Sequence, residues 1–172
     1  MNRSCSIRRR VAAAAWLGAI LVLVTNGVYA DPPIRPLDHP VWRQECSACH
    51  VAYPPQLLSA PSWRAIMNGL DRHFGADARL DSQARADILR FLELNAGRSE
   101  TPLGGKPPLR ITETRWFIHE HTEELPASVW KRPDVKSPAN CVACHFAADR
   151  GDYSERTLRL PKGFSTPRTQ LP

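Results

Sequence analysis

The sequence has 172 residues, 42% of them hydrophobic, with 23 Lys and Arg against 17 Asp and Glu, a formal net charge of +6. Four arginines and no acidic residue lie in the first 30 positions, which leaves the remainder nearly neutral, at about +2. This balance argues against a strongly basic surface of the kind that binds nucleic acid or an anionic membrane.

The first 30 residues have the features of a secretory signal peptide. A basic stretch with Arg3 and the arginines at 8–10 precedes an apolar run over residues 11–24, and Val28 and Ala30 stand at −3 and −1 of a cleavage site. A retained membrane anchor is the alternative, but a spanning helix needs about 20 apolar residues. We therefore predict cleavage after Ala30, export to the periplasm and no membrane span afterwards.

Residues 31–98 are predicted to form a helical domain. After a proline-rich lead, a short helix is expected over residues 41–50. Asp81 is a suitable N-cap for a later helix over residues 82–95, whose apolar residues recur with helical spacing.

Another helix, between these two, is predicted to carry a histidine on its apolar face. From Ser62 to Phe74 the apolar residues recur with helical spacing, His73 shares their face, and Gly75 ends the helix. An unpaired imidazole among apolar side chains costs free energy, so His73 is expected to have a partner.

Residues 99–172 are predicted to form a second, smaller domain with little regular structure. Five of the ten residues at 99–108 are Pro or Gly, which indicates a domain boundary. One short helix is expected over residues 114–124, whereas residues 151–172 show little periodicity. The predicted fold class is therefore mainly α.

The helix expected at 114–124 contains His119 and His121. Side chains two positions apart on a helix point in roughly opposite directions, about 200° from each other, so these two histidines cannot both face one site. His121 shares its side with Phe117 and Leu125, whereas His119 shares a polar side. We predict that His121 is the inward-facing histidine and that His119 is a surface residue.

All four cysteines outside the signal peptide lie in two Cys-x-x-Cys-His motifs. The motifs are Cys46, Cys49 and His50, and Cys141, Cys144 and His145. Two thiols at this spacing attach the vinyl groups of a haem, and the adjacent histidine ligates its iron. A disulfide framework or a zinc site leaves the histidines unexplained, and the flanks lack the βαβ context of a thioredoxin-like motif. We predict two covalent haem c groups with His50 and His145 as proximal ligands.

The sixth ligand of each iron separates a closed electron carrier from an enzyme or ligand binder with an open iron. The remaining histidines are His39, His73, His119 and His121. We predict His73 and His121 as distal ligands because of the apolar faces on which they lie. His39 is a reserve ligand, and Met67 is an alternative for one haem.

Longer segments of the chain resemble the small bacterial periplasmic dihaem cytochromes c. The matching positions are Trp42 with residues 45–55, residues 62–65 with 71–75, residues 110–112 with Trp116, Phe117 and His121, residues 139–145, and residues 151–153. The resemblance implies a first domain similar to a class I cytochrome c, with histidine in place of the usual methionine ligand, and a less regular second haem domain. Carried over by position, the distal ligands fall on His73 and His121.

The resemblance also implies an electron carrier with two bis-histidine haems. Some relatives serve an oxygen-binding monohaem cytochrome c and a membrane cytochrome b. We therefore expect a periplasmic protein that relays single electrons between redox partners, with the ligand pairs His50/His73 and His145/His121. The alternative is a dihaem peroxidase-type enzyme or a ligand-binding haem protein with one open iron.

Overall fold

The computed structural model describes residues 34–98, 105–122 and 125–164, all within one compact unit, Pro32–Pro172. The regular structure of these residues consists of four α-helices and short 3-10 helices, without a strand, which confirms the predicted mainly α fold. No helix among them is long and apolar enough to cross a membrane. The predicted signal peptide lies outside the described residues.

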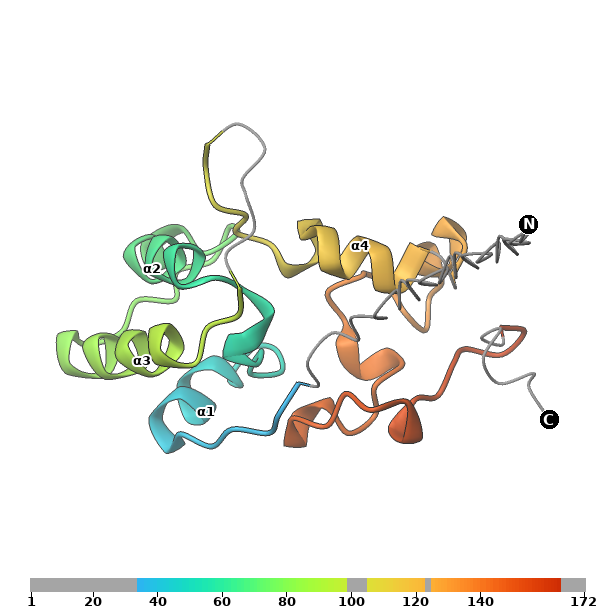
Figure 1. Cartoon of the computed structure of the whole chain (residues 1–172), viewed down its shortest axis with the longest axis horizontal. Coiled ribbons are helices and arrows are strands. Elements are labelled where there is room, and N and C mark those ends of the chain that lie inside the picture. The colour runs from blue at the N-terminus through green and yellow to red at the C-terminus, as the bar shows by residue number, and fades with distance from the viewer. Residues whose placement is uncertain (1–33, 99–104, 123–124, 165–172) are drawn as a thin grey trace, which may run out of the picture. The chain divides into compact units, whose positions relative to one another are not determined.

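Three helices form the first half of the described chain (Figure 1). They are α1 (Pro40–Cys46), α2 (Ala60–Asn68) and α3 (Ser82–Leu94). Ser59 caps α2, and the predicted cap Asp81 accepts hydrogen bonds from the first turn of α3. Their apolar sides meet in a core of nine buried residues: Trp42, Ala52, Leu58, Trp63, Ile66, Met67, Leu70, Ile88 and Leu92.

Two of the predicted helices end earlier than expected. The helix expected over residues 41–50 stops at Cys46, where the backbone N–H and the hydroxyl of Ser47 both donate to the carbonyl of Arg43. The helix expected as far as Phe74 stops at Asn68, because Gly69 leaves helical geometry and a 3-10 turn follows. His73 therefore lies in a non-helical turn, and its predicted place on a helical face was wrong.

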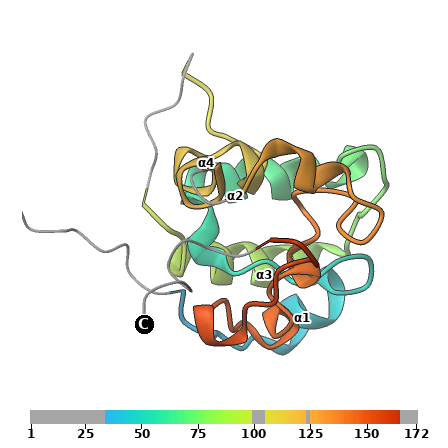
Figure 2. The same ribbon diagram turned by 90° about the vertical axis from the view of Figure 1, so that its right-hand side faces the viewer.

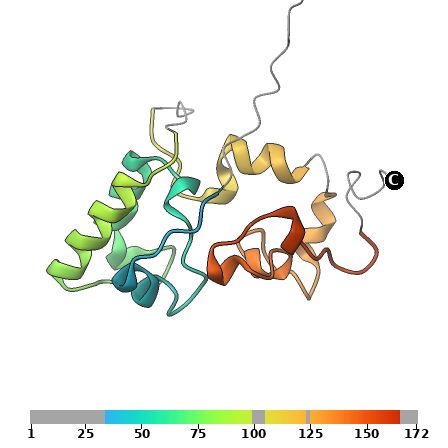
Figure 3. The same cartoon turned by 60° about the horizontal axis from the view of Figure 1, so that its bottom comes forward.

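The second half has one α-helix, α4 (Arg115–Thr122), within the predicted range 114–124. The other regular elements are five 3-10 helices: Ile111–Glu113, Ala127–Lys131, Cys141–Ala143, Ala148–Arg150 and Glu155–Thr157. A small core of Leu125, Val129 and Val135 supports them. Figures 2 and 3 show α4 on one side of this half and the turns that follow Cys141 on the other.

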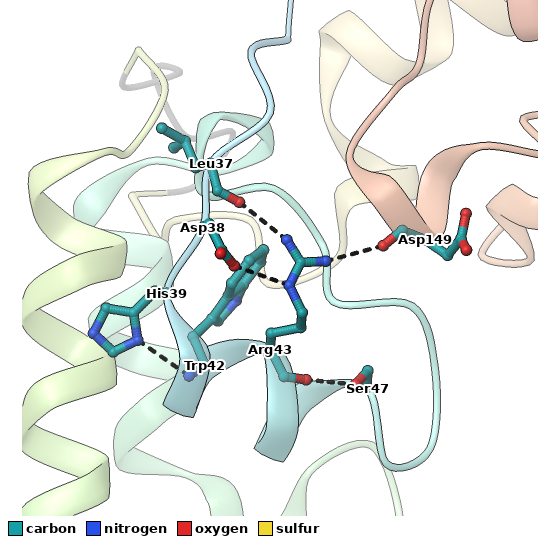
Figure 4. A network of polar contacts seen from close by, with 7 residues as sticks. All are labelled: Leu37, Asp38, His39, Trp42, Arg43, Ser47 and Asp149. Atoms are coloured by element: carbon teal, nitrogen blue, oxygen red, sulfur yellow. Dashed lines mark hydrogen bonds and ion pairs between the residues drawn. The ribbon is translucent and has the colours of Figure 1, made fainter.

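Two side chains of the first half donate hydrogen bonds to backbone carbonyls of the second. Arg43 reaches the carbonyl of Asp149 at 3.0 Å while it also bonds Asp38 at 3.0 Å (Figure 4). The hydroxyl of Tyr53 donates to the carbonyl of Ala139 at 2.8 Å. The predicted boundary between residues 98 and 99 stays a prediction, because 99–104 lie outside the described residues.

Candidate haem-binding sites

The first candidate site begins where α1 ends. Cys46 is the last residue of α1, and Cys49 and His50 follow in an exposed turn. Nδ1 of His50 lies 2.7 Å from the carbonyl oxygen of Val51. A carbonyl only accepts, so Nδ1 carries the proton and the lone pair is on Nε2, the arrangement of a metal-ligating histidine oriented by its backbone.

His73 lies across from His50. Their ring centres are 6.2 Å apart, with 26° between the ring planes. Two imidazoles that bind one metal ion from opposite sides, each through a nitrogen about 2 Å from it, have ring centres about 6 Å apart. Burial, together with His50, lowers the pKa of His73, which favours the neutral imidazole that a metal requires.

The second candidate site repeats this pairing on different elements. His145 follows the 3-10 helix Cys141–Ala143, and His121 lies on α4. Their ring centres are 6.3 Å apart, at 67° between planes. Nδ1 of His121 is 2.9 Å from the carbonyl of Phe117, which again places the lone pair on Nε2. Burial, together with His121, lowers the pKa of His145 to about 4.

A cavity joins the four groups of the second site. It contains about 1100 Å³ of empty space, including the part open to solvent. Cys141, Cys144, His121 and His145 all line it, among mainly apolar side chains. Nδ1 of His145 and the hydroxyl of Tyr153 are buried there without a hydrogen-bond partner among the described residues. The walls therefore fit a large, mainly apolar group with a few polar atoms.

The thiols of both motifs are free of disulfides in the described chain. Burial raises the pKa of Cys46 and of Cys141 to about 11, so both are protonated thiols at neutral pH. Among the described residues, no three His, Cys, Asp or Glu side chains are placed to hold a metal ion between them. The residues are arranged as two thiols and two opposed imidazoles, the set that a covalent haem uses.

The other ligand candidates lie elsewhere. Nδ1 of His39 accepts from the N–H of Trp42, and its Nε2 is 3.3 Å from Asp87 (Figure 4 shows the first contact). Met67 is buried in the core of the first half. His119 is exposed on α4.

A family model for dihaem cytochrome c matches residues 42–153. The chain belongs to this family. The dihaem cytochrome c from Rhodobacter sphaeroides is 39% identical, with a TM-score of 0.61 over 71% of this chain and 100% of that one. The dihaem cytochrome sb-DHC from Shewanella baltica OS155 is 38% identical, with a TM-score of 0.62 over 74% of this chain and 95% of that one. No curated protein matches.

As a dihaem cytochrome c, the chain carries two covalently bound haem c groups, and haem-based electron transfer is its chemistry. Both Cys-x-x-Cys-His motifs fall inside the matched range. The assignment of individual cysteines and histidines to the haems stays a prediction. The distance between the two imidazole rings within each site supports it.

Two tyrosines of this dihaem cytochrome c contact the predicted proximal histidines, and the sequence did not reveal either contact. Tyr53 stacks on His50, with ring centres 4.6 Å apart at 16°. The ring centre of Tyr153 lies 5.4 Å from that of His145. The only sign in the sequence is that both tyrosines lie in segments that resemble the family.

Proposed function

We propose that this dihaem cytochrome c is a periplasmic electron carrier in which both irons have two histidine ligands. The pairs are His50 with His73 and His145 with His121. The supporting observation is that each motif histidine has an imidazole from elsewhere in the chain at a ring-centre distance of 6.2 or 6.3 Å. An iron with both axial positions filled has no place for a substrate, which favours electron transfer.

The haems supply one-electron chemistry, and the residues of the chain hold them and set their potentials. The backbone carbonyls beside His50 and His121 fix which ring nitrogen faces the metal. Two imidazoles lack the thioether that raises the potential of His/Met cytochromes, so both potentials should be comparatively low.

The partners we propose are other redox proteins, among them an oxygen-binding monohaem cytochrome c and a membrane cytochrome b. Electron-transfer encounters of this kind use small interfaces, below about 1,200 Å². The N-terminal segment, with its basic, apolar and small-residue regions, supports export to the periplasm.

Visible spectra of the purified protein test the carrier function. We expect two low-spin haems per chain and no spectral change when carbon monoxide is added to the reduced protein. A high-spin band, or rapid binding of carbon monoxide, would contradict the proposal, because either result shows an open iron.

A further inference from the structure

Tyr53 contacts a histidine of the first candidate site and a backbone carbonyl close in sequence to the second. Its ring stacks on that of His50 at 4.6 Å. Its hydroxyl donates a 2.8 Å hydrogen bond to the carbonyl oxygen of Ala139, 86 positions later in the chain. Ala139 lies two residues before Cys141, the first attachment cysteine of the second motif.

The turn that Tyr53 reaches in the second half is held in place by its own hydrogen bonds. The N–H of Ala139 donates to the hydroxyl of Ser137 at 3.1 Å, and the side chain of Asn140 donates to the carbonyl of Val135 at 2.9 Å. The sulfur of Cys141 lies 3.7 Å from the same Ala139 oxygen that Tyr53 contacts. The carbonyl oxygen of Ala139 therefore contacts both the hydroxyl of Tyr53 and the sulfur of a predicted haem-attachment cysteine.

The loop that carries Tyr53 is anchored on the other side. Nδ1 of His50 bonds the carbonyl of Val51, and the buried indole N–H of Trp63 donates to the carbonyl of Pro55 at 2.7 Å. A phenol is protonated at neutral pH, so the hydroxyl of Tyr53 can donate its hydrogen bond.

We propose that Tyr53 is the positioning residue that connects the two haems, and that electrons pass between them along the contacts His50, Tyr53, Ala139 and Cys141. The inference rests on the proposed carrier function. In each transfer one Fe(II) becomes Fe(III) and one Fe(III) becomes Fe(II). No bond forms or breaks at Tyr53, and its hydroxyl keeps its proton.

Two substitutions separate the contributions of the ring and the hydroxyl of Tyr53. Tyr53→Phe keeps an aromatic ring beside His50 and removes the hydrogen bond to Ala139, whereas Tyr53→Leu removes both. Arg43→Gln is the matched control, because Arg43 also joins the two halves through a backbone carbonyl, that of Asp149, but contacts neither histidine pair.

The measurement is the rate of electron exchange within the full-length protein carrying both haems. Exchange broadening of the haem methyl resonances in half-reduced samples reports this rate. Visible spectra show whether each variant keeps two low-spin haems. We expect Tyr53→Leu to exchange electrons about tenfold more slowly than the unaltered protein, which is about 1.4 kcal/mol on the barrier. Tyr53→Phe should fall between the two, and Arg43→Gln should match the unaltered protein.

Two results would overturn the inference while leaving the carrier function intact: an unchanged rate in Tyr53→Leu, or an equal loss of rate in Arg43→Gln. If Tyr53→Leu does not fold, Tyr53→Phe decides alone, and an unaltered rate in that variant counts against the proposal. A high-spin or carbon monoxide-binding haem in the unaltered protein would instead contradict the carrier function itself.

Discussion

Each half of the protein contains a pair of opposed imidazoles, but the two halves differ in secondary structure and in the size of their cores. The first half has three helices around nine buried residues, and its pair lies in turns at the edge of that core. The second half has one helix, short 3-10 turns and three buried core residues. At about 2 kcal/mol per fully buried large apolar side chain, the first core contributes roughly three times the hydrophobic stabilisation of the second.

This difference indicates that the second half depends on its haem for a core. It contains the cavity lined by both thiols and both imidazoles of the second site, whose mainly apolar walls fit a haem macrocycle. Small domains of this kind, with too little apolar surface of their own, commonly fold only with a bound metal or cofactor.

The largest effect is expected when the attachment cysteines are removed. Changing Cys141 and Cys144 to Ala should abolish amide protection across residues 125–164, because the cavity loses the group that fills it. Changing Cys46 and Cys49 to Ala should leave α2 and α3 protected. Hydrogen exchange of both variants measures this, and an equal loss of protection in the two halves would show that they depend on haem to the same degree.

Removal of either predicted distal ligand should leave both haems attached and convert one of them to high spin. We expect this for His73→Ala and for His121→Ala in visible and electron paramagnetic resonance spectra. His119→Ala is the matched control, since His119 is exposed on the same helix as His121. A high-spin signal from His119→Ala, with none from His121→Ala, would reverse the assignment in the second half.

A smaller loss of stability is expected from truncation of the first core. Leu92 is 1% exposed in α3, and Leu92→Ala should lower the free energy of unfolding by about 2–5 kcal/mol. Leu94→Ala, two residues later and 75% exposed, should change it by less than about 0.5 kcal/mol. Denaturant titration followed by far-ultraviolet circular dichroism compares them. Equal effects would mean that α3 does not pack as described.

The smallest effect concerns a feature that the halves share. Each has an exposed phenylalanine after a predicted ligand: Phe74 under Arg110 at 4.2 Å, and Phe146 under Arg159 at 4.1 Å. Replacing either arginine by Gln should cost about 0.5–1 kcal/mol in thermal denaturation, the value of an exposed cation–π contact.

Arg90→Gln, at an exposed position of α3, is the control for general loss of charge. Arg110 lies in the second half and covers Phe74 of the first, whereas Arg159 and Phe146 both lie in the second half. The two replacements should nevertheless have similar effects, in contrast to the effects of losing each haem, and a much larger effect at Arg159 than at Arg110 would contradict this.

The sequence was most informative where chemistry depends on neighbouring residues. The motifs and the cap Asp81 need only a few consecutive positions, and the buried side of α4, with Phe117, follows from helical spacing. The apolar spacing failed after Gly69, because a 3-10 turn also repeats every three residues and so extends the helical pattern. Phe74, predicted to lie on the apolar face, is 48% exposed.

Contacts between distant segments could not be predicted from the sequence. No local pattern brings Tyr53 to a carbonyl 86 positions away, because a hydroxyl bound to backbone has no complementary side chain to mark it. The distances between the paired imidazoles likewise depend on how the turns fold.

The walls of the cavity at the second site come from almost the whole length of the described chain. Ile34, near its start, and Leu160, near its end, line the same space. Chain ends usually tolerate trimming and fusion because few contacts hold them. Here, trimming either end as far as these residues would remove part of the cavity wall, although Ile34 lies far from the Cys-x-x-Cys-His motif of this site in sequence. The walls of the second haem site therefore depend on nearly the whole described chain.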